Sequence, residues 1–267
     1  MIAGSRRREC HDTRVFTVED RERARARVLE LAAADPRIVA GAVLGSLALG
    51  EGDRWSDLDL MFALADGVKV SEPLTDWTAK LASELDAVRL FDLPFRTTTY
   101  RVFLLPGCLQ LDLSFTPERD FAPAGPNFRL LFGVAGAPIA PDAPTPASDL
   151  LGLAVHHALR ARFCIERQRH WQAEYWISAV RDHALSLACR RRGLPEHHGR
   201  GFDDLPSEVL DAFSSALVRS LERDELLRAL SSAITALLAE SDDARELAMR
   251  VEPQLRELAG DARPAAE

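Results

Sequence analysis

The stretch of sequence that decides the fold is VLGSLALGEGDRWSDLDLMF, residues 43–62. It begins as an apolar run, breaks at Gly45 and Ser46, crosses a glycine-rich turn and resumes as a strand in which aspartate alternates with leucine. Residues i and i+2 of a strand point to the same face, so we expect Asp57 and Asp59 side by side, about 7 Å apart at Cα. Two carboxylates this close repel each other unless a cation lies between them.

The residue types in this stretch favour Mg²⁺ as the cation and a phosphate as a further ligand. Mg²⁺ takes all-oxygen shells and usually keeps phosphate oxygens among its ligands. Gly45 allows a close approach of the backbone, and Ser46 adds a hydroxyl beside exposed N–H groups. This is the composition of a phosphate-holding turn.

A third acid lies in a second alternating strand, GCLQLDLSF, residues 107–115. Asp112 alternates with leucines there, so its side chain faces away from theirs. A lone acid in an apolar strand is costly to bury unpaired. A metal shared with Asp57 and Asp59 would remove that cost.

In order, spacing and strand context, these elements resemble the DNA polymerase β-type nucleotidyltransferase superfamily. Within it the chain is most similar to the bacterial antibiotic nucleotidyltransferases, which adenylylate aminoglycosides or lincosamides. The resemblance covers residues 36–116 at the level of motifs. It implies an α+β protein, with an N-terminal mixed-sheet nucleotidyltransferase domain followed by an all-α helical bundle.

The resemblance also implies a two-metal mechanism with ATP as co-substrate. Asp57 and Asp59 would bridge two Mg²⁺ ions. Asp112 would complete the site of the ion that binds the acceptor hydroxyl, and could take the hydroxyl proton. Gly45 and Ser46 would hold the triphosphate.

Each motif taken alone also has a simpler structural interpretation. Asp57 and Asp59 could be strand-end acids on a solvated face, and Asp112 could lie on the wet face of an antiparallel sheet. Gly45 and Ser46 could form an ordinary turn. The joint pattern favours the functional interpretation.

Periodicity predicts a sheet domain followed by helices, with the boundary in the Pro-, Gly- and Ala-rich residues 116–147. We assign residues 1–145 to the nucleotidyltransferase domain and 146–267 to a helical acceptor-binding domain. The expected helices are 17–34, 73–85, 148–169 (capped by Ser148 and Asp149), 171–192, 207–220, 222–240 and 242–258, and the expected strands are 37–44, 57–64, 87–92, 97–105, 108–115 and 128–132.

The helix expected over 171–192 carries charged residues on one face. Glu174 and Asp182 would suit a cationic, hydroxylated acceptor such as an aminoglycoside, and Arg181 could reach the nucleotide phosphates. The alternative is a solvated face with no ligand.

Composition limits the partners. The formal net charge of -8 argues against a polynucleotide as the main partner. The four cysteines are far apart and form no C-x-x-C pair, which supports neither a zinc site nor a redox motif. With no apolar segment after the N-terminal arginines and no window long enough to span a membrane, we expect a cytoplasmic protein.

Three hypotheses follow from these observations. The chain could transfer AMP from ATP to a hydroxyl of a small molecule, plausibly an antibiotic. It could adenylylate a protein partner, or it could be a nucleotide-binding module of the same fold without turnover. The acceptor, the position modified, the nucleotide preference and the oligomeric state stay open, as does whether Asp112 or a helical-domain acid such as Glu174 is the base.

Overall fold

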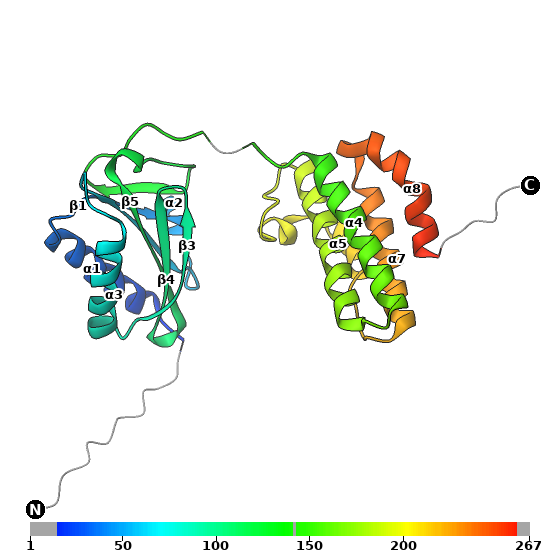
Figure 1. The fold of residues 1–267 in the computed structure, drawn as a ribbon, viewed down its shortest axis with the longest axis horizontal. Helices are drawn as coiled ribbons and strands as arrows, with labels where there is room; N and C mark the ends of the chain where they lie inside the picture. The colour runs from blue at the N-terminus through cyan, green and yellow to red at the C-terminus, as the bar shows by residue number, and fades with distance from the viewer. Residues whose placement is uncertain (1–14, 141–142, 261–267) are drawn as a thin grey trace, which may run out of the picture. The chain divides into compact units, whose positions relative to one another are not determined.

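A computed structural model describes residues 15–140 and 143–260 of the chain. The chain divides into two compact units, Met1–Asp142 and Ala143–Glu267. The first contains a mixed sheet with helices, and the second is helical (Figure 1). The predicted α+β class is confirmed. The assignment of 1–145 to nucleotidyl transfer and of 146–267 to acceptor binding stays a prediction.

The first unit is built on a six-stranded sheet of order β3-β4-β5-β2-β1-β6. Its strands are β1 (Ile38–Leu44), β2 (Leu58–Leu64), β3 (Val88–Phe95), β4 (Thr98–Leu105), β5 (Leu109–Pro117) and β6 (Phe128–Phe132). Neighbouring strands are antiparallel except β2 and β5, which run parallel. Parallel neighbours require a crossover connection, supplied here by α3 (Ser71–Leu85) and the β3-β4 hairpin.

Helices α1 (Val18–Ala34) and α3 cover one face of this sheet (Figure 1). The alternation of β2 sends Leu58, Leu60 and Phe62 into that covered face, where they are fully buried. The ring of Trp77 on α3 packs 5.5 Å from that of Phe62, centroid to centroid. The opposite face therefore receives the other side chains of the strand, among them Asp59.

α1 begins close to the expected residue 17 and has a capping box at its start. The side chain of Thr17 accepts the backbone N–H of Asp20, and the Asp20 carboxylate accepts the backbone N–H of Thr17. Such a reciprocal pair satisfies two otherwise open donors at a helix start. The helix ends at Ala34, before Asp35 and Pro36, as expected.

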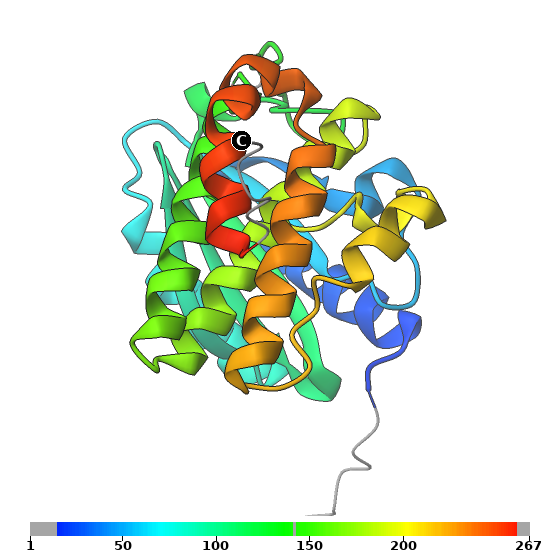
Figure 2. The same cartoon turned by 90° about the vertical axis from the view of Figure 1, so that its right-hand side faces the viewer.

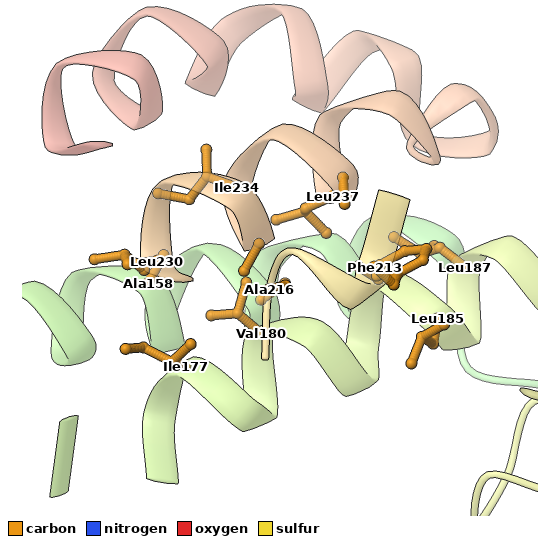
Figure 3. Packing of buried hydrophobic residues seen from close by; sticks show 14 of the residues in the cluster. Ala158, Ile177, Val180, Leu185, Leu187, Phe213, Ala216, Leu230, Ile234 and Leu237 are labelled. Carbon is orange, nitrogen blue, oxygen red and sulfur yellow. The ribbon is translucent and has the colours of Figure 1, made fainter. Parts of the chain in front are cut away.

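The second unit consists of α4 (Ala147–Glu166), α5 (His170–Arg191), α6 (Ser207–Ser214), α7 (Arg223–Ala239) and α8 (Arg245–Ala259) with short connections. Helices α4, α5 and α7 lie side by side, as Figures 1 and 2 both show. Ala158, Ile177, Val180, Leu230 and Ile234 meet between them (Figure 3). The small alanines allow the helix backbones to approach closely.

Two helix limits predicted for this unit are wrong. α4 begins at Ala147, after Pro146, so Ser148 and Asp149 lie inside its first turn and do not cap it. Pro146 has an extended backbone conformation, and its missing N–H costs nothing at a helix start.

The helix predicted over 207–220 ends at Ser214. Arg228 on α7 donates to the carbonyl oxygens of Ser215 and Leu217, the second at 2.8 Å. These bonds from a distant helix replace the intrahelical partners that a longer α6 would need.

None of the helices in the described part of the chain combines the length and the apolar character that a bilayer crossing requires.

Asp35, at the end of α1, forms a partly buried ion pair with Arg37 and accepts a hydrogen bond from Trp77 on α3. Asp35 is 6% exposed and accepts from Trp77 Nε1 at 2.9 Å and from Arg37 Nη2 at 2.8 Å. We expect Asp35→Ala to lower the free energy of unfolding of this unit by about 2–4 kcal/mol, because it leaves a buried N–H and a guanidinium without their acceptor. Urea unfolding followed by tryptophan fluorescence measures this. The control is Asp76→Ala, which removes the exposed partner of Arg37 at 2.8 Å and should lower the free energy of unfolding by less than about 1 kcal/mol. Equal losses of unfolding free energy in the two variants would contradict this account of Asp35.

The same pair predicts how acid affects stability. The hydrogen bonds from Arg37, and to a lesser degree that from Trp77, hold the pKa of Asp35 well below its ordinary 3.8, although burial opposes them. A carboxyl with a lowered folded-state pKa stabilises the fold above its unfolded-state pKa, and this contribution disappears as the pH falls below that value. Stability should therefore decline more steeply below about pH 4 in the wild type than in Asp35→Asn. Identical acid profiles for the two proteins would be inconsistent with this.

Candidate metal site

Three carboxylates gather on the face of the sheet opposite α1 and α3. One oxygen each from Asp57, Asp59 and Asp112 lies within 4.8 Å of the others, and all three residues are partly buried. Asp59 and Asp112 are direct partners in the parallel β2-β5 pair. Because paired residues of neighbouring strands project to the same side, this register places the two carboxylates together.

Asp57 reaches the cluster from a different position than predicted. It lies directly before β2, which begins at Leu58, and not within the strand. The alternation argument therefore explains the direction of Asp59 but not that of Asp57. The position of Asp57 is set by the loop that leads into the strand.

The electrostatics of the cluster favour a cation. Burial raises the pKa of the Asp112 carboxyl, and the charge of Asp57 raises it further, while a hydrogen bond from Gln110 Nε2 at 3.0 Å acts in the opposite direction. Tyr100 is also affected, because burial and the charge of Asp59 both raise the pKa of its hydroxyl. Three convergent carboxylate oxygens are the donor set that a hard divalent ion such as Mg²⁺ prefers.

Gly45 is required by the position of Asp59. Its φ of +66° lies in the left-handed region, and a Cβ built on it would lie 2.4 Å from Asp59 Oδ2. The turn predicted at Gly45 and Ser46 is a short helix, α2 (Gly45–Leu49), which follows β1. A backbone without a side chain therefore lies directly against one metal-ligand candidate.

Ser46 is part of a chain of hydrogen bonds within the following loop. Its Oγ lies 3.1 Å from Ser56 Oγ. Ser56 Oγ donates to Asp53 Oδ1 at 3.0 Å and accepts the backbone N–H of Asp53 at 2.9 Å. These bonds give the loop between α2 and β2 a defined shape, and that loop delivers Asp57.

Arg21 holds the same loop from α1, and sequence reasoning missed it. It is 3% exposed, and its Nη1 donates to the carbonyl oxygens of Asp53 at 2.6 Å and Ser56 at 3.0 Å. A buried arginine that donates to two backbone carbonyl oxygens holds that part of the backbone in place, and its own charge is partly compensated by the carbonyl dipoles. Nothing in the spacing identifies it, because it lies more than thirty positions before the residues that it binds.

The other predicted site residues lie on α5, in the second unit. Glu174 accepts from Ser178 Oγ at 2.8 Å, and Arg181 pairs with Asp182 at 3.1 Å. Asp182 also lines a hollow of about 330 Å³ together with His183. The structure brings Arg181 and Asp182 together, and their assignment to phosphates and acceptor stays a prediction.

Comparison with known proteins does not identify a family. No protein-family model matches the chain, and no curated protein matches it. Among solved structures the chain is similar to an aminoglycoside 6-adenyltransferase from Bacillus subtilis, with 12% identity and a TM-score of 0.36, over 86% of this chain and 95% of that chain. A similarity at this level does not assign a function.

Gly45 and Gly50 offer a matched test of the site. Both have positive φ, +66° and +76°, but a Cβ at Gly50 would meet nothing within 4 Å. We expect Gly45→Ala and Gly50→Ala to cost similar backbone strain, about 1–2 kcal/mol. Only Gly45→Ala should also displace the Asp59 carboxylate and weaken Mn²⁺ binding, by about tenfold or more. Electron paramagnetic resonance of free Mn²⁺ measures this, and equal Mn²⁺ affinities of the two variants would exclude the contact as a determinant of the site.

Proposed function

We propose that the chain is a nucleotidyltransferase that moves AMP from Mg²⁺-ATP to a hydroxyl of a small molecule and releases pyrophosphate. The observation that carries this proposal is the cluster of Asp57, Asp59 and Asp112, with Gly45 against Asp59. Carboxylates that converge from neighbouring strands are suited to bind divalent ions together with phosphate oxygens. The resemblance of the motifs to the DNA polymerase β-type superfamily agrees with this reaction.

Bound at these acids, two Mg²⁺ ions would stabilise the charge that develops on the attacking and leaving oxygens. Asp57 and Asp59 would bind both ions, and Asp112 would bind the one nearer the acceptor. The missing side chain of Gly45 lets the Asp59 carboxylate lie against the backbone, and Gly45 and Ser46 would hold the triphosphate.

The reaction places a specific demand on Asp112. The acceptor oxygen forms a bond to the α-phosphorus, the bond from that phosphorus to the bridging oxygen breaks, and pyrophosphate leaves with the electron pair. The hydroxyl proton must go to a base. Asp112 would suit this role because it would bind the ion nearer the acceptor and so lie within reach of the hydroxyl proton.

The helical unit would contribute to substrate binding. Arg181 would bind nucleotide phosphates, while Glu174 and Asp182 would bind positive charge on an acceptor such as an aminoglycoside. ATP as co-substrate agrees with the cytoplasmic location expected from the sequence. The support for this part is the residue chemistry of α5 alone.

Asp59→Asn tests the proposal. The substitution keeps the size of the side chain but removes the charge, so we expect Mg²⁺-ATP binding to weaken by more than about tenfold and turnover to fall on the order of 10³-fold. Calorimetric titration of Mg²⁺-ATP and a pyrophosphate-release assay measure the two effects. The control is Asp66→Asn, which removes one charge from an exposed turn of the same unit and should change neither.

Full activity of Asp59→Asn would refute the assignment of the metal ligands. A wild type that binds ATP in a metal-dependent way but shows no turnover would favour the non-catalytic module. Turnover that needs a protein in place of a small hydroxylated molecule would favour adenylylation of a protein partner.

A further inference from the structure

A hollow lies on the face of the sheet opposite α1 and α3, beside the aspartates. Its volume is about 740 Å³, within the range of about 300–1,000 Å³ that is typical of pockets for drug-sized ligands. Met61 lines it and lies two residues after Asp59 on β2, so both side chains project to the same face. Tyr100 lines it too and is paired on β4 with Ser114, which lies two residues after Asp112 on β5 and so projects to the same face. The hollow and the aspartate cluster are therefore neighbours within one unit.

The lining of the hollow is largely apolar and aromatic. Leu44, Met61, Phe95, Tyr100 and Phe128 contribute from five different strands. Aromatic walls of this kind bind planar or apolar surface, and the tyrosine adds a polar group. A highly hydroxylated molecule would leave most of this surface without a matching contact.

The charged residues of the lining are positive on balance. Arg96, Arg119 and Asp120 line the hollow, and Arg119 Nε lies 3.6 Å from Asp120 Oδ2. The guanidinium of Arg96 lies 5.2 Å from the centre of the Phe95 ring. The three aspartates of the neighbouring cluster oppose this charge, so the lining does not set the sign of a ligand's charge.

The lining of the hollow includes residues on both sides of Asp112 in the strand order. The proposed triphosphate position at Gly45 follows β1, whereas Phe95, Thr98 and Tyr100 lie on β3 and β4, beyond β5 in the strand order. Asp112, the proposed base, lies on β5 between them. An acceptor bound against Phe95 and Tyr100 would therefore lie on the side of Asp112 that is away from Gly45.

We propose that this hollow binds the acceptor, and that the acceptor is a molecule with an apolar or aromatic body. This inference rests on the proposed nucleotidyl transfer and narrows its substrate class. It differs from the cationic aminoglycoside expected from Glu174 and Asp182. An acceptor of this class would place its apolar body against Met61 and Tyr100 and extend a hydroxyl toward Asp112.

The test uses 8-anilinonaphthalene-1-sulfonate, an anionic aromatic probe whose fluorescence increases in apolar sites. The full-length wild type should bind it saturably. Ala124 and Ala137 line the hollow and are exposed, so Ala124→Trp and Ala137→Trp should fill it and weaken binding by about tenfold or more. Ala79→Trp is the control, because Ala79 is exposed on α3, on the other face of the sheet.

Competition then identifies the occupant. Mg²⁺-ATP should leave the probe bound, since enzyme, nucleotide and acceptor must form one complex, and the polycation kanamycin should fail to displace it. Displacement by Mg²⁺-ATP would assign the hollow to the nucleotide, and displacement by kanamycin would overturn the substrate class. The inference itself would be overturned if the wild type did not bind the probe saturably, or if Ala124→Trp and Ala137→Trp both bound it as well as the wild type does.

A separate measurement tests the proposed function independently of the hollow. Calorimetry of Mg²⁺-ATP with the wild type measures the metal and nucleotide site without the probe. A wild type that binds the probe but no nucleotide would refute nucleotidyl transfer, whereas one that binds nucleotide but no probe would refute only the assignment of the hollow.

Discussion

The parallel pairing of β2 with β5 is the interaction on which the candidate site depends. It is the one parallel pair of the sheet, and its register sets Asp59 directly opposite Asp112. A shift of one residue would send one of these carboxylates into the covered face, among Leu60 and Phe62. The apolar residues of both strands fix that register, because they must face α1 and α3. The hydrophobic core of the first unit thus positions the acids that project from its other side.

Around this pair the molecule carries features that a purely structural sheet would not need. Three carboxylates within 4.8 Å repel one another, and burial raises the pKa of Asp112. Gly45 adopts a left-handed conformation against Asp59, which costs conformational entropy. Arg21 is buried and donates hydrogen bonds to the loop that leads to Asp57. Features that lower the stability of the fold in this way are typical of functional sites, where binding or catalysis requires them.

The part of the fold that could be predicted from the sequence is the part that depends on local periodicity. The alternation around Asp59 and Asp112 predicts two strands with acids on one face, and the strands are found there. Their parallel pairing could not be predicted, because it depends on the crossover through α3 and the β3-β4 hairpin. Arg21 and the early end of α6 could not be predicted either. Both depend on an arginine that binds carbonyl oxygens far away in the sequence, and such contacts leave no periodic signal.

The hollow beside the acids also depends on tertiary structure, because its lining comes from five strands and the segments around β6. In our proposal, the acids, Gly45 and the hollow together form a site for a metal-bound nucleotide and an apolar acceptor within one unit. The most direct measurement is an anomalous difference map from crystals grown with Mn²⁺ and a non-hydrolysable ATP analogue. The account predicts Mn²⁺ within about 2.0–2.3 Å of carboxylate oxygens of Asp57, Asp59 and Asp112, with the triphosphate beside Gly45. Mn²⁺ and nucleotide bound away from these three aspartates would contradict it.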